Sequence, residues 1–282
     1  MIVVLGKNGL LGQAFTNRLG DESVGLSRSE VDFTNFQELG KLLDDINPSV
    51  IINCAAKVSL SEVEENQAET FKVNTMLPFF LANYCPQSSG AKKLVHISTD
   101  HLFCDDMLAH DEAVPVTILN EYASQKYIAE RLVLHQNPAA LIVRTSILGT
   151  RNLDGSTLIE WILKTVKNNG EISGFVNVNT SSIPADSLVQ LVKLAVDRDL
   201  SGVYNIGSES PYSKYELVAA IVDYLNLSGV KVGKAHQENA TVTRATNCGL
   251  DCSAFVAATG AELPRFPGFL EEMDLRGIYD TI

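Results

Sequence analysis

The sequence predicts an α/β protein with a Rossmann-type, doubly wound parallel sheet and a smaller C-terminal substrate-binding lobe. Short runs that are apolar on both faces alternate with helical stretches, as expected for strands buried inside a parallel sheet. A glycine-rich turn directly follows the first run, and the regular alternation loosens after Gly149. The strand-like runs are residues 2–5, 24–26, 50–52, 94–97 and 141–143.

Helical patterns separate these runs, and they predict right-handed crossovers between parallel strands. They cover residues 10–19, 36–46, 62–84 (with a break near Pro78) and 122–135. We expect residues 1–149 to form a dinucleotide-binding domain and residues 150–282 to form the substrate-binding lobe. Within that lobe, a segment at about 175–206 is expected to return to the main sheet.

The composition is that of an ordinary globular protein, and it disfavours several classes of function. The chain of 282 residues is 45% apolar and 20% charged, and no apolar run approaches the ~20 residues needed to span a bilayer. The net charge of −12 disfavours binding to nucleic acid. Met1 leads straight into the first strand-like run, so we expect no signal peptide and a cytoplasmic protein.

The cysteines favour a reducing compartment, because they number five, which is few and odd for a chain of this length. Cys248 and Cys252 lie close together in the sequence, but no second pair and no nearby histidine completes a zinc site. We therefore expect free, mostly buried thiols and no metal.

The glycine turn resembles a phosphate-binding loop, although its G-x-x-G-x-x-G spacing is one residue wider than the commonest dinucleotide fingerprint. Gly6, Gly9 and Gly12 follow a buried strand and open a helix, which permits a tight turn and a close approach to a pyrophosphate. The free N–H groups at the start of the helix would complete the site. No Gly-Lys-Ser/Thr ends the loop, so a nucleoside-triphosphate loop is disfavoured. The expected cofactor contacts within the turn are Gly6, Asn8, Gly9, Leu10, Leu11 and Gly12.

Residues after the second and third strands indicate which dinucleotide would bind. Arg28 stands where an arginine accommodates a 2′-phosphate, so NADP(H) is favoured and NAD(H) is the alternative. Asp32 would hydrogen-bond the adenine or cap the next helix. The small residues Ala55 and Ala56 leave space for a ligand in the crevice.

The reacting centre is predicted from Tyr122 and Lys126, which stand one helical turn apart on a predicted helix. A ketone reduced by hydride develops negative charge on oxygen and needs a proton donor. A nearby ammonium would lower the pKa of the tyrosine towards working pH, and Lys126 would also hold the nicotinamide ribose. Thr99, just past the fourth strand, would donate a second hydrogen bond to the carbonyl oxygen. A surface tyrosine–lysine pair is the alternative interpretation.

Two aromatic side chains are given plainer interpretations. His101 follows Thr99 closely enough for a role as an acid, but a loop histidine without that role is favoured. Trp161 lies beside Ile162 and Leu163 on a predicted helix, so we expect it in the core rather than as a stacking platform for a base.

These residues together resemble the extended short-chain dehydrogenase/reductase superfamily, and within it the dTDP-4-dehydrorhamnose reductase family. The likeness extends along nearly the whole chain. It is carried by the glycine turn and by residues 31–34, 48–56, 73–74, 95–100, 120–126, 143–146 and 244–251. The resemblance implies a Rossmann-type fold and a catalytic triad of Thr99, Tyr122 and Lys126. It also implies substrate contacts from Thr99, Tyr122 and Arg244, and reduction of a nucleotide-linked 4-keto-6-deoxy sugar by NAD(P)H.

Departures from the family pattern fall mainly around the substrate. His101 replaces a tyrosine, Ala123 replaces a glycine, and Ile147 stands where a tryptophan is common. Two alternatives therefore stay open. The first is a non-catalytic or regulatory NADP-binding protein, a description that fits one relative of the family, the regulatory subunit of methionine adenosyltransferase. The second is a nucleotide-sugar epimerase or dehydratase. The helices at 62–84 and 122–135 could also pair across a homodimer.

Overall fold

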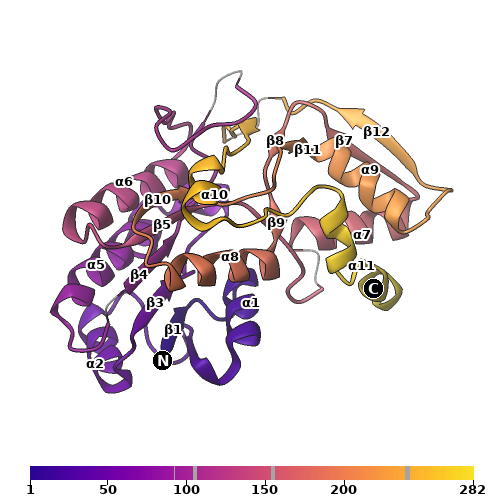
Figure 1. The fold of residues 1–282 in the computed structure, drawn as a ribbon. Coiled ribbons are helices and arrows are strands. Elements are labelled where there is room, and N and C mark those ends of the chain that lie inside the picture. Colours follow the sequence, from indigo (N-terminus) through magenta and orange to yellow (C-terminus); the bar gives the residue numbers. More distant parts are fainter. Residues whose placement is uncertain (92, 104–106, 154–155, 239–241) are drawn as a thin grey trace.

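The computed structural model describes residues 1–91, 93–103, 107–153, 156–238 and 242–282. Six parallel strands form the main sheet in the order β10-β5-β4-β3-β1-β2 (Figure 1). The predicted Rossmann-type α/β class is confirmed. The strands of this sheet are β1 (Ile2–Leu5), β2 (Ser23–Leu26), β3 (Val50–Asn53), β4 (Lys93–Ile97), β5 (Leu141–Arg144) and β10 (Gly202–Asn205).

Helices cover both faces of this sheet, which explains why its strands are apolar on both sides. On one face, α1 (Leu10–Leu19) and α8 (Ala185–Asp197) pack against side chains such as Val4 and Val143. On the other face lie α2 (Phe36–Ile46), α5 (Leu77–Gln87) and α6 (Glu121–Gln136). The carboxyl ends of the parallel strands therefore open into one crevice at an edge between these layers.

The predicted helix at 62–84 is broken into several pieces, but not at the expected place. It forms α3 (Leu60–Glu65), α4 (Gln67–Phe71), a π-helical stretch Lys72–Met76 and then α5. Pro78 lies in the first turn of α5, which follows the π-helical stretch directly with helical backbone at Met76 and Leu77, so the helical path is not broken there.

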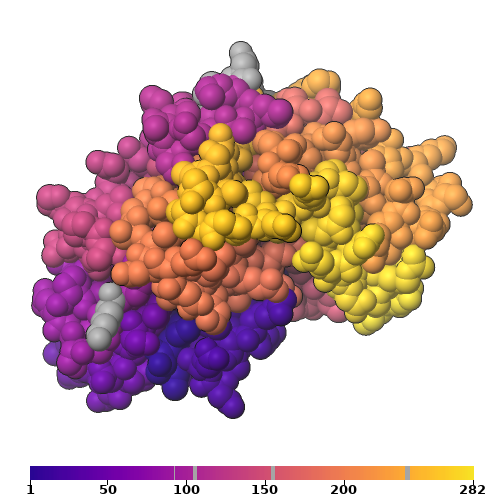
Figure 2. Space-filling view, in the orientation of Figure 1, coloured from indigo at the N-terminus to yellow at the C-terminus, as the bar shows by residue number. Residues whose placement is uncertain are grey.

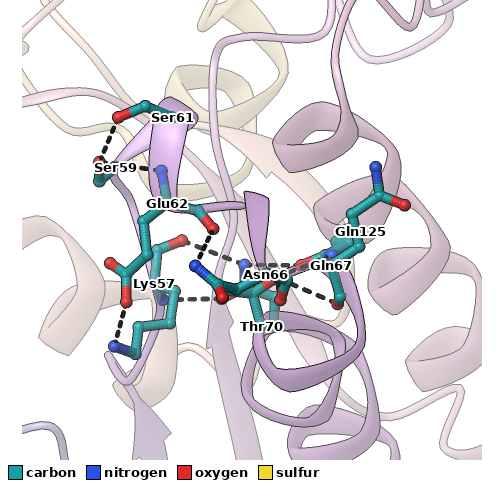
Figure 3. Close-up of polar contacts among 9 residues, drawn as sticks. Lys57, Ser59, Ser61, Glu62, Asn66, Gln67, Thr70 and Gln125 are labelled. Carbon is teal, nitrogen blue, oxygen red and sulfur yellow. Dashed lines mark hydrogen bonds and ion pairs between the residues drawn. The ribbon is translucent and has the colours of Figure 1, made fainter. Parts of the chain in front are cut away.

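Polar contacts hold the segment before α5 against α6 (Figure 3). Ser59 caps α3 by accepting a hydrogen bond from the backbone N–H of Glu62. The side chain of Gln125, which comes from α6, donates to the carbonyl of Gln67 and to Oγ1 of Thr70. These bonds join α4 to the helix that carries Tyr122, so they fix the position of one side of the crevice.

A second lobe is built mainly from the C-terminal half of the chain. Helix α7 (Leu158–Asn169), helix α9 (Lys214–Tyr224) and helix α11 (Leu275–Thr281) surround the parallel pair β7 (Glu171–Phe175) and β12 (Lys231–Ala235). Short strands connect this lobe to the sheet: β6 (Ile147–Leu148), β8 (Asn179–Thr180), β9 (Ile183–Pro184), β11 (Tyr212–Ser213) and β13 (Asn247–Cys248).

The C-terminal part of the chain joins the two cores. Helix α10 (Ser253–Thr259) inserts Phe255 into the core beneath the main sheet, and the 3₁₀ helix Gly268–Glu272 places Phe269 in the core of the second lobe. In the space-filling view this yellow segment lies across both parts of the molecule (Figure 2).

Of the helices that the structure describes, none combines the length and the apolarity needed to cross a bilayer. Among the described residues, no cluster of histidine, cysteine and acidic side chains has the arrangement of a metal site. The thiols of Cys54, Cys85, Cys248 and Cys252 form no disulfide, and burial raises the pKa of Cys85 and of Cys252 to about 12. Cys104 lies outside the described residues.

Candidate active site

A cavity of about 370 Å³ lies over the glycine turn, at the carboxyl ends of β1, β2 and β3. Predicted cofactor residues that line it are Gly6, Asn8, Gly9, Arg28, Ala55 and Ala56. The cavity is not lined by the other predicted cofactor residues, which are Leu10, Leu11, Gly12, Asp32 and Lys126. Leu11 packs in the core, although α1 begins at Leu10 and its first backbone N–H groups are free of helical partners.

Glycine is required at two positions in the turn. Gly6 has φ +90°, and a Cβ there would lie 2.9 Å from the backbone nitrogen of Ala55. A Cβ on Gly12 would lie 2.1 Å from the carbonyl oxygen of Gly6, so only glycine lets α1 pack against the turn. The turn therefore has the close backbone packing that a pyrophosphate site needs.

Asp32 uses its carboxylate locally. Its Oδ1 accepts hydrogen bonds from the backbone N–H of Thr34 at 2.9 Å and from Oγ1 of Thr34 at 2.8 Å, and these bonds lower its pKa. Helix α2 is capped by Asn35 instead. The capping interpretation of Asp32 is therefore wrong, because a side chain two residues away already satisfies the carboxylate.

An acidic residue near Arg28, Glu30, was not predicted from the sequence. One oxygen of Glu30 accepts from Nζ of Lys7 at 2.7 Å, and the other accepts from the backbone N–H and Oγ of Ser27, each at 2.8 Å. These contacts lower the pKa of Glu30 to about 2. The carboxylate is thus engaged with Lys7 and Ser27, whereas Arg28 is exposed at the cavity wall.

Tyr122 lies in the first turn of α6, which begins after Asn120 accepts a hydrogen bond from the N–H of Ala123 at 2.8 Å. The tyrosine is buried, and its hydroxyl shares a hydrogen bond with Thr99. The pKa of Tyr122 is raised to about 12, mainly by burial and also by Asp100, while the Thr99 contact acts to lower it. The expected lowering by Lys126 is therefore absent, because that ammonium points elsewhere.

Lys126 is buried one turn along α6 and faces the sheet. Its Nζ donates to the carbonyl of Ile97 at 2.7 Å and lies 3.3 Å from Nε2 of His96. Burial lowers the pKa of Lys126 to about 8, and Glu130 and Cys54 oppose that shift. Cys54 lines the cavity over the glycine turn, so Lys126 lies within electrostatic reach of that cavity.

A larger cavity of about 780 Å³ lies between the sheet and the second lobe. Asp100 and His101 line it, and the His101 ring stands edge-on to Tyr122 with the ring centroids 6.3 Å apart. Arg244, which the resemblance implicates in substrate binding, also lines it. The Tyr122–Lys126 pair therefore lies between the two cavities.

Two further residues of the larger cavity were not predicted as site residues. Lys214, the first residue of α9, faces Asp100; burial lowers the pKa of Lys214 and raises that of Asp100, and each charge opposes the other's shift. Trp161 is 45% exposed and lines the cavity, so its expected place in the core is wrong. Both α7 and α9 are amphipathic, and neither residue carries a local motif that separates a cavity side chain from a surface one.

The fold and the site define a dinucleotide-binding protein of the short-chain dehydrogenase/reductase type: a doubly wound sheet, a glycine turn at its crevice, and a Thr–Tyr–Lys group beside a second cavity. The chain belongs to the family described as RmlD substrate binding domain, whose model matches residues 1–274.

Individual relatives agree with this placement. A dTDP-4-dehydrorhamnose reductase from Aggregatibacter actinomycetemcomitans is 29% identical, over 79% of this chain and 78% of its own. The beta subunit of methionine adenosyltransferase 2 from Danio rerio is 24% identical, over 89% of this chain and 83% of its own. The structure of dTDP-4-dehydrorhamnose reductase from Bacillus anthracis in complex with NADP has the same fold, with a TM-score of 0.89, 24% identity and 98% of each chain covered.

Proposed function

We propose that the protein is an NADP(H)-dependent oxidoreductase that reduces the keto group of a nucleotide-linked 4-keto-6-deoxy sugar. The observation that carries the proposal is the position of Tyr122. Its hydroxyl bonds Thr99, and its ring stands edge-on to His101, which lines the larger cavity. Lys126 on the same helix interacts electrostatically with Cys54, which lines the cofactor cavity. The reductase relatives from Aggregatibacter and Bacillus anthracis support the substrate class.

In the proposed reduction each residue of the site has a separate role. When bound, NADPH supplies the hydride to the sugar carbon. Thr99 donates a hydrogen bond to the carbonyl oxygen, which stabilises the negative charge that develops there. Tyr122 gives its proton to that oxygen, and Lys126 holds the ribose. Gly6, Gly9 and the start of α1 hold the pyrophosphate.

The larger cavity takes the sugar and its nucleotide. Arg244 and Lys231 line it and would neutralise the diphosphate, since the net charge of the chain is −12 and offers no general attraction for an anion. In this proposal residues 1–149 are the dinucleotide-binding domain and residues 150–282 the substrate-binding lobe. The exceptions are α8, β10 and Phe255 of α10, which pack with the main sheet. A cytoplasmic location and a homodimer stay predictions.

Replacing Arg28 with alanine is expected to raise the KM for NADPH by about tenfold, because a charge-assisted bond to the 2′-phosphate contributes ~1.5 kcal/mol. The KM for NADH, which lacks that phosphate, should change little. Steady-state kinetics with each cofactor make the measurement. Arg18→Ala removes an exposed arginine of α1 that pairs with Asp186, and it serves as the matched control. Equal losses for both cofactors would remove Arg28 from the phosphate site.

Trp161 is expected to stack on the nucleotide base. It is the single tryptophan of the chain, so its fluorescence reports directly on the larger cavity. Titration with dTDP should change that fluorescence, and Trp161→Ala should weaken dTDP binding by about tenfold because base stacking contributes ~1–3 kcal/mol. Trp161→Phe keeps an aromatic face and should retain most of the affinity. Fluorescence that is unchanged at saturating dTDP would show that the base binds elsewhere.

The direct test is consumption of NADPH. Purified protein mixed with NADPH and a dTDP-4-keto-6-deoxyhexose should lose absorbance of the reduced cofactor, with one NADPH oxidised for each sugar reduced. A second candidate function is a regulatory protein that binds NADP without turnover, and the relative from Danio rerio favours it. That candidate is correct if the protein binds NADPH but oxidises none across a panel of keto-sugars. Tightly bound NAD after purification would instead indicate an epimerase or dehydratase.

A further inference from the structure

A buried chain of hydrogen bonds runs beneath the reacting centre, through Asn53, His96 and Lys126. These side chains come from β3, β4 and α6, and each is at most 1% exposed. Nδ2 of Asn53 lies 3.2 Å from Nδ1 of His96, and Nε2 of His96 lies 3.3 Å from Nζ of Lys126. The proposed reaction assigns no role to Asn53 or His96.

The orientation of the Asn53 amide determines where the imidazole carries its proton. Oδ1 of Asn53 accepts the backbone N–H of Ala55 at 3.1 Å, so the amide presents its NH₂ group to His96. Nδ1 of the imidazole must accept that bond. A neutral imidazole has one N–H, which therefore resides on Nε2 and points at Lys126.

This N–H distinguishes the two protonation states of the lysine. The free amine has a lone pair and accepts from Nε2–H, whereas the ammonium has only donors and meets another donor. The opposite imidazole tautomer would meet the NH₂ group of Asn53, and turning that amide would leave the N–H of Ala55 without its acceptor. Burial holds His96 neutral by lowering its pKa far below the ordinary range.

Other groups around Lys126 do not cancel this preference. Glu130, on the same helix, directs its carboxylate to Arg144 and Ser98, with Oε2 2.7 Å from Nη2 of the arginine. Cys54 follows β3, and its thiol has a pKa raised by burial, so it is uncharged. The carbonyl of Ile97 accepts from either form of the lysine.

We propose that His96 is a positioning residue for the proposed reduction: held as the Nε2–H tautomer by Asn53, it favours the amine form of Lys126 and so sets the pH above which the lysine no longer holds the ribose as an ammonium. The inference rests on the proposed function for its catalytic consequence. The tautomer itself does not depend on any activity.

The first test is therefore spectroscopic. The chain has five histidines, so protein labelled with nitrogen-15 histidine gives a spectrum in which His96 is assigned by its loss in His96→Gln. We expect a neutral ring with its proton on Nε2 across the range from about pH 5 to about pH 9. A proton on Nδ1, or an imidazolium at neutral pH, would overturn the proposal even if the protein proves inactive.

The second test is the pH profile of kcat/KM. The rate should fall as pH rises through about 8, because Lys126 then loses the charge with which it holds the ribose. In His96→Gln the side-chain carbonyl of the glutamine can accept a hydrogen bond from the ammonium. The alkaline limb of the profile, where kcat/KM falls, should therefore move up by about one pH unit, while the plateau at lower pH is largely kept. His110→Gln, which alters another buried histidine stacked on Phe103, is the control and should leave the limb in place.

An unmoved limb in a folded, active His96→Gln variant would contradict the proposal. A wild-type protein that reduces no keto-sugar would contradict the proposed function, and the nitrogen-15 spectra would still decide which tautomer His96 adopts.

Discussion

Tyr122→Phe is expected to lower kcat for keto-sugar reduction by about 10²- to 10⁴-fold, the usual contribution of a general acid. The phenylalanine keeps the buried ring against His101 but removes the hydroxyl that bonds Thr99. Binding of NADPH should be almost unchanged, because the tyrosine does not line the cofactor cavity. Single-turnover kinetics and a cofactor titration measure the two quantities separately.

Tyr127 offers a matched control on the same helix. It is partly buried and packs against the small cluster around Leu102, away from both cavities. Tyr127→Phe should leave the rate close to that of the unmodified protein. If Tyr122→Phe retained more than about a tenth of the rate, another group would have to supply the proton.

Glu130→Ala is expected to lower the free energy of unfolding by ~3–5 kcal/mol, because it leaves the buried guanidinium of Arg144 without its partner. Glu130 is 1% exposed and Arg144 4%. Nε and Nη2 of the arginine both donate to the carboxylate, which also accepts from Oγ of Ser98. Of the described residues, none accepts from Nη1 of Arg144, so no second acceptor is at hand to compensate. Urea denaturation measures the loss.

An exposed ion pair provides the contrast. Lys193 and Asp197 form a bond of 2.8 Å on the outer face of α8, where each side chain is about half exposed. Asp197→Ala should cost only ~0.3–0.5 kcal/mol, as solvent screens such pairs. A loss of under 1 kcal/mol in Glu130→Ala would show that Arg144 finds water or another acceptor.

Periodicity and the glycine turn were sufficient to predict the central architecture. The helix predicted at 36–46 is α2 (Phe36–Ile46), and the apolar runs at 2–5 and 94–97 are β1 and most of β4. Strands buried on both faces have a strong apolar signal, so their positions are set by local composition. The helix at 62–84 was less predictable: the backbone leaves the helical region at Asn66, and the segment that follows bonds Gln125, more than 50 residues away in the sequence.

Residues of the candidate site that belong to a sequence motif could be predicted. Contacts that depend on how distant segments pack together could not. Thr99 and Tyr122 share a hydrogen bond, and Lys126 follows one turn along α6, because their spacing follows the end of a strand and the turn of a helix. The direction of the Lys126 ammonium depends instead on the carbonyl of Ile97, which lies in β4 and accepts its hydrogen bond. The engagement of Glu30 with Lys7 likewise joins residues 23 positions apart that share no motif.

The position of β10 has a consequence for how the parts of this enzyme can be exchanged. Gly202–Asn205 forms the outer strand beside β5, although the chain has by then already built α7, β7 and α8. A fragment ending near Gly149 would leave the apolar residues of β5 as a bare sheet edge, the kind of edge that recruits other chains. A chimera that exchanges substrate specificity between relatives must therefore replace loops and keep β10 in place. Replacing the whole C-terminal half as one unit would also replace β10.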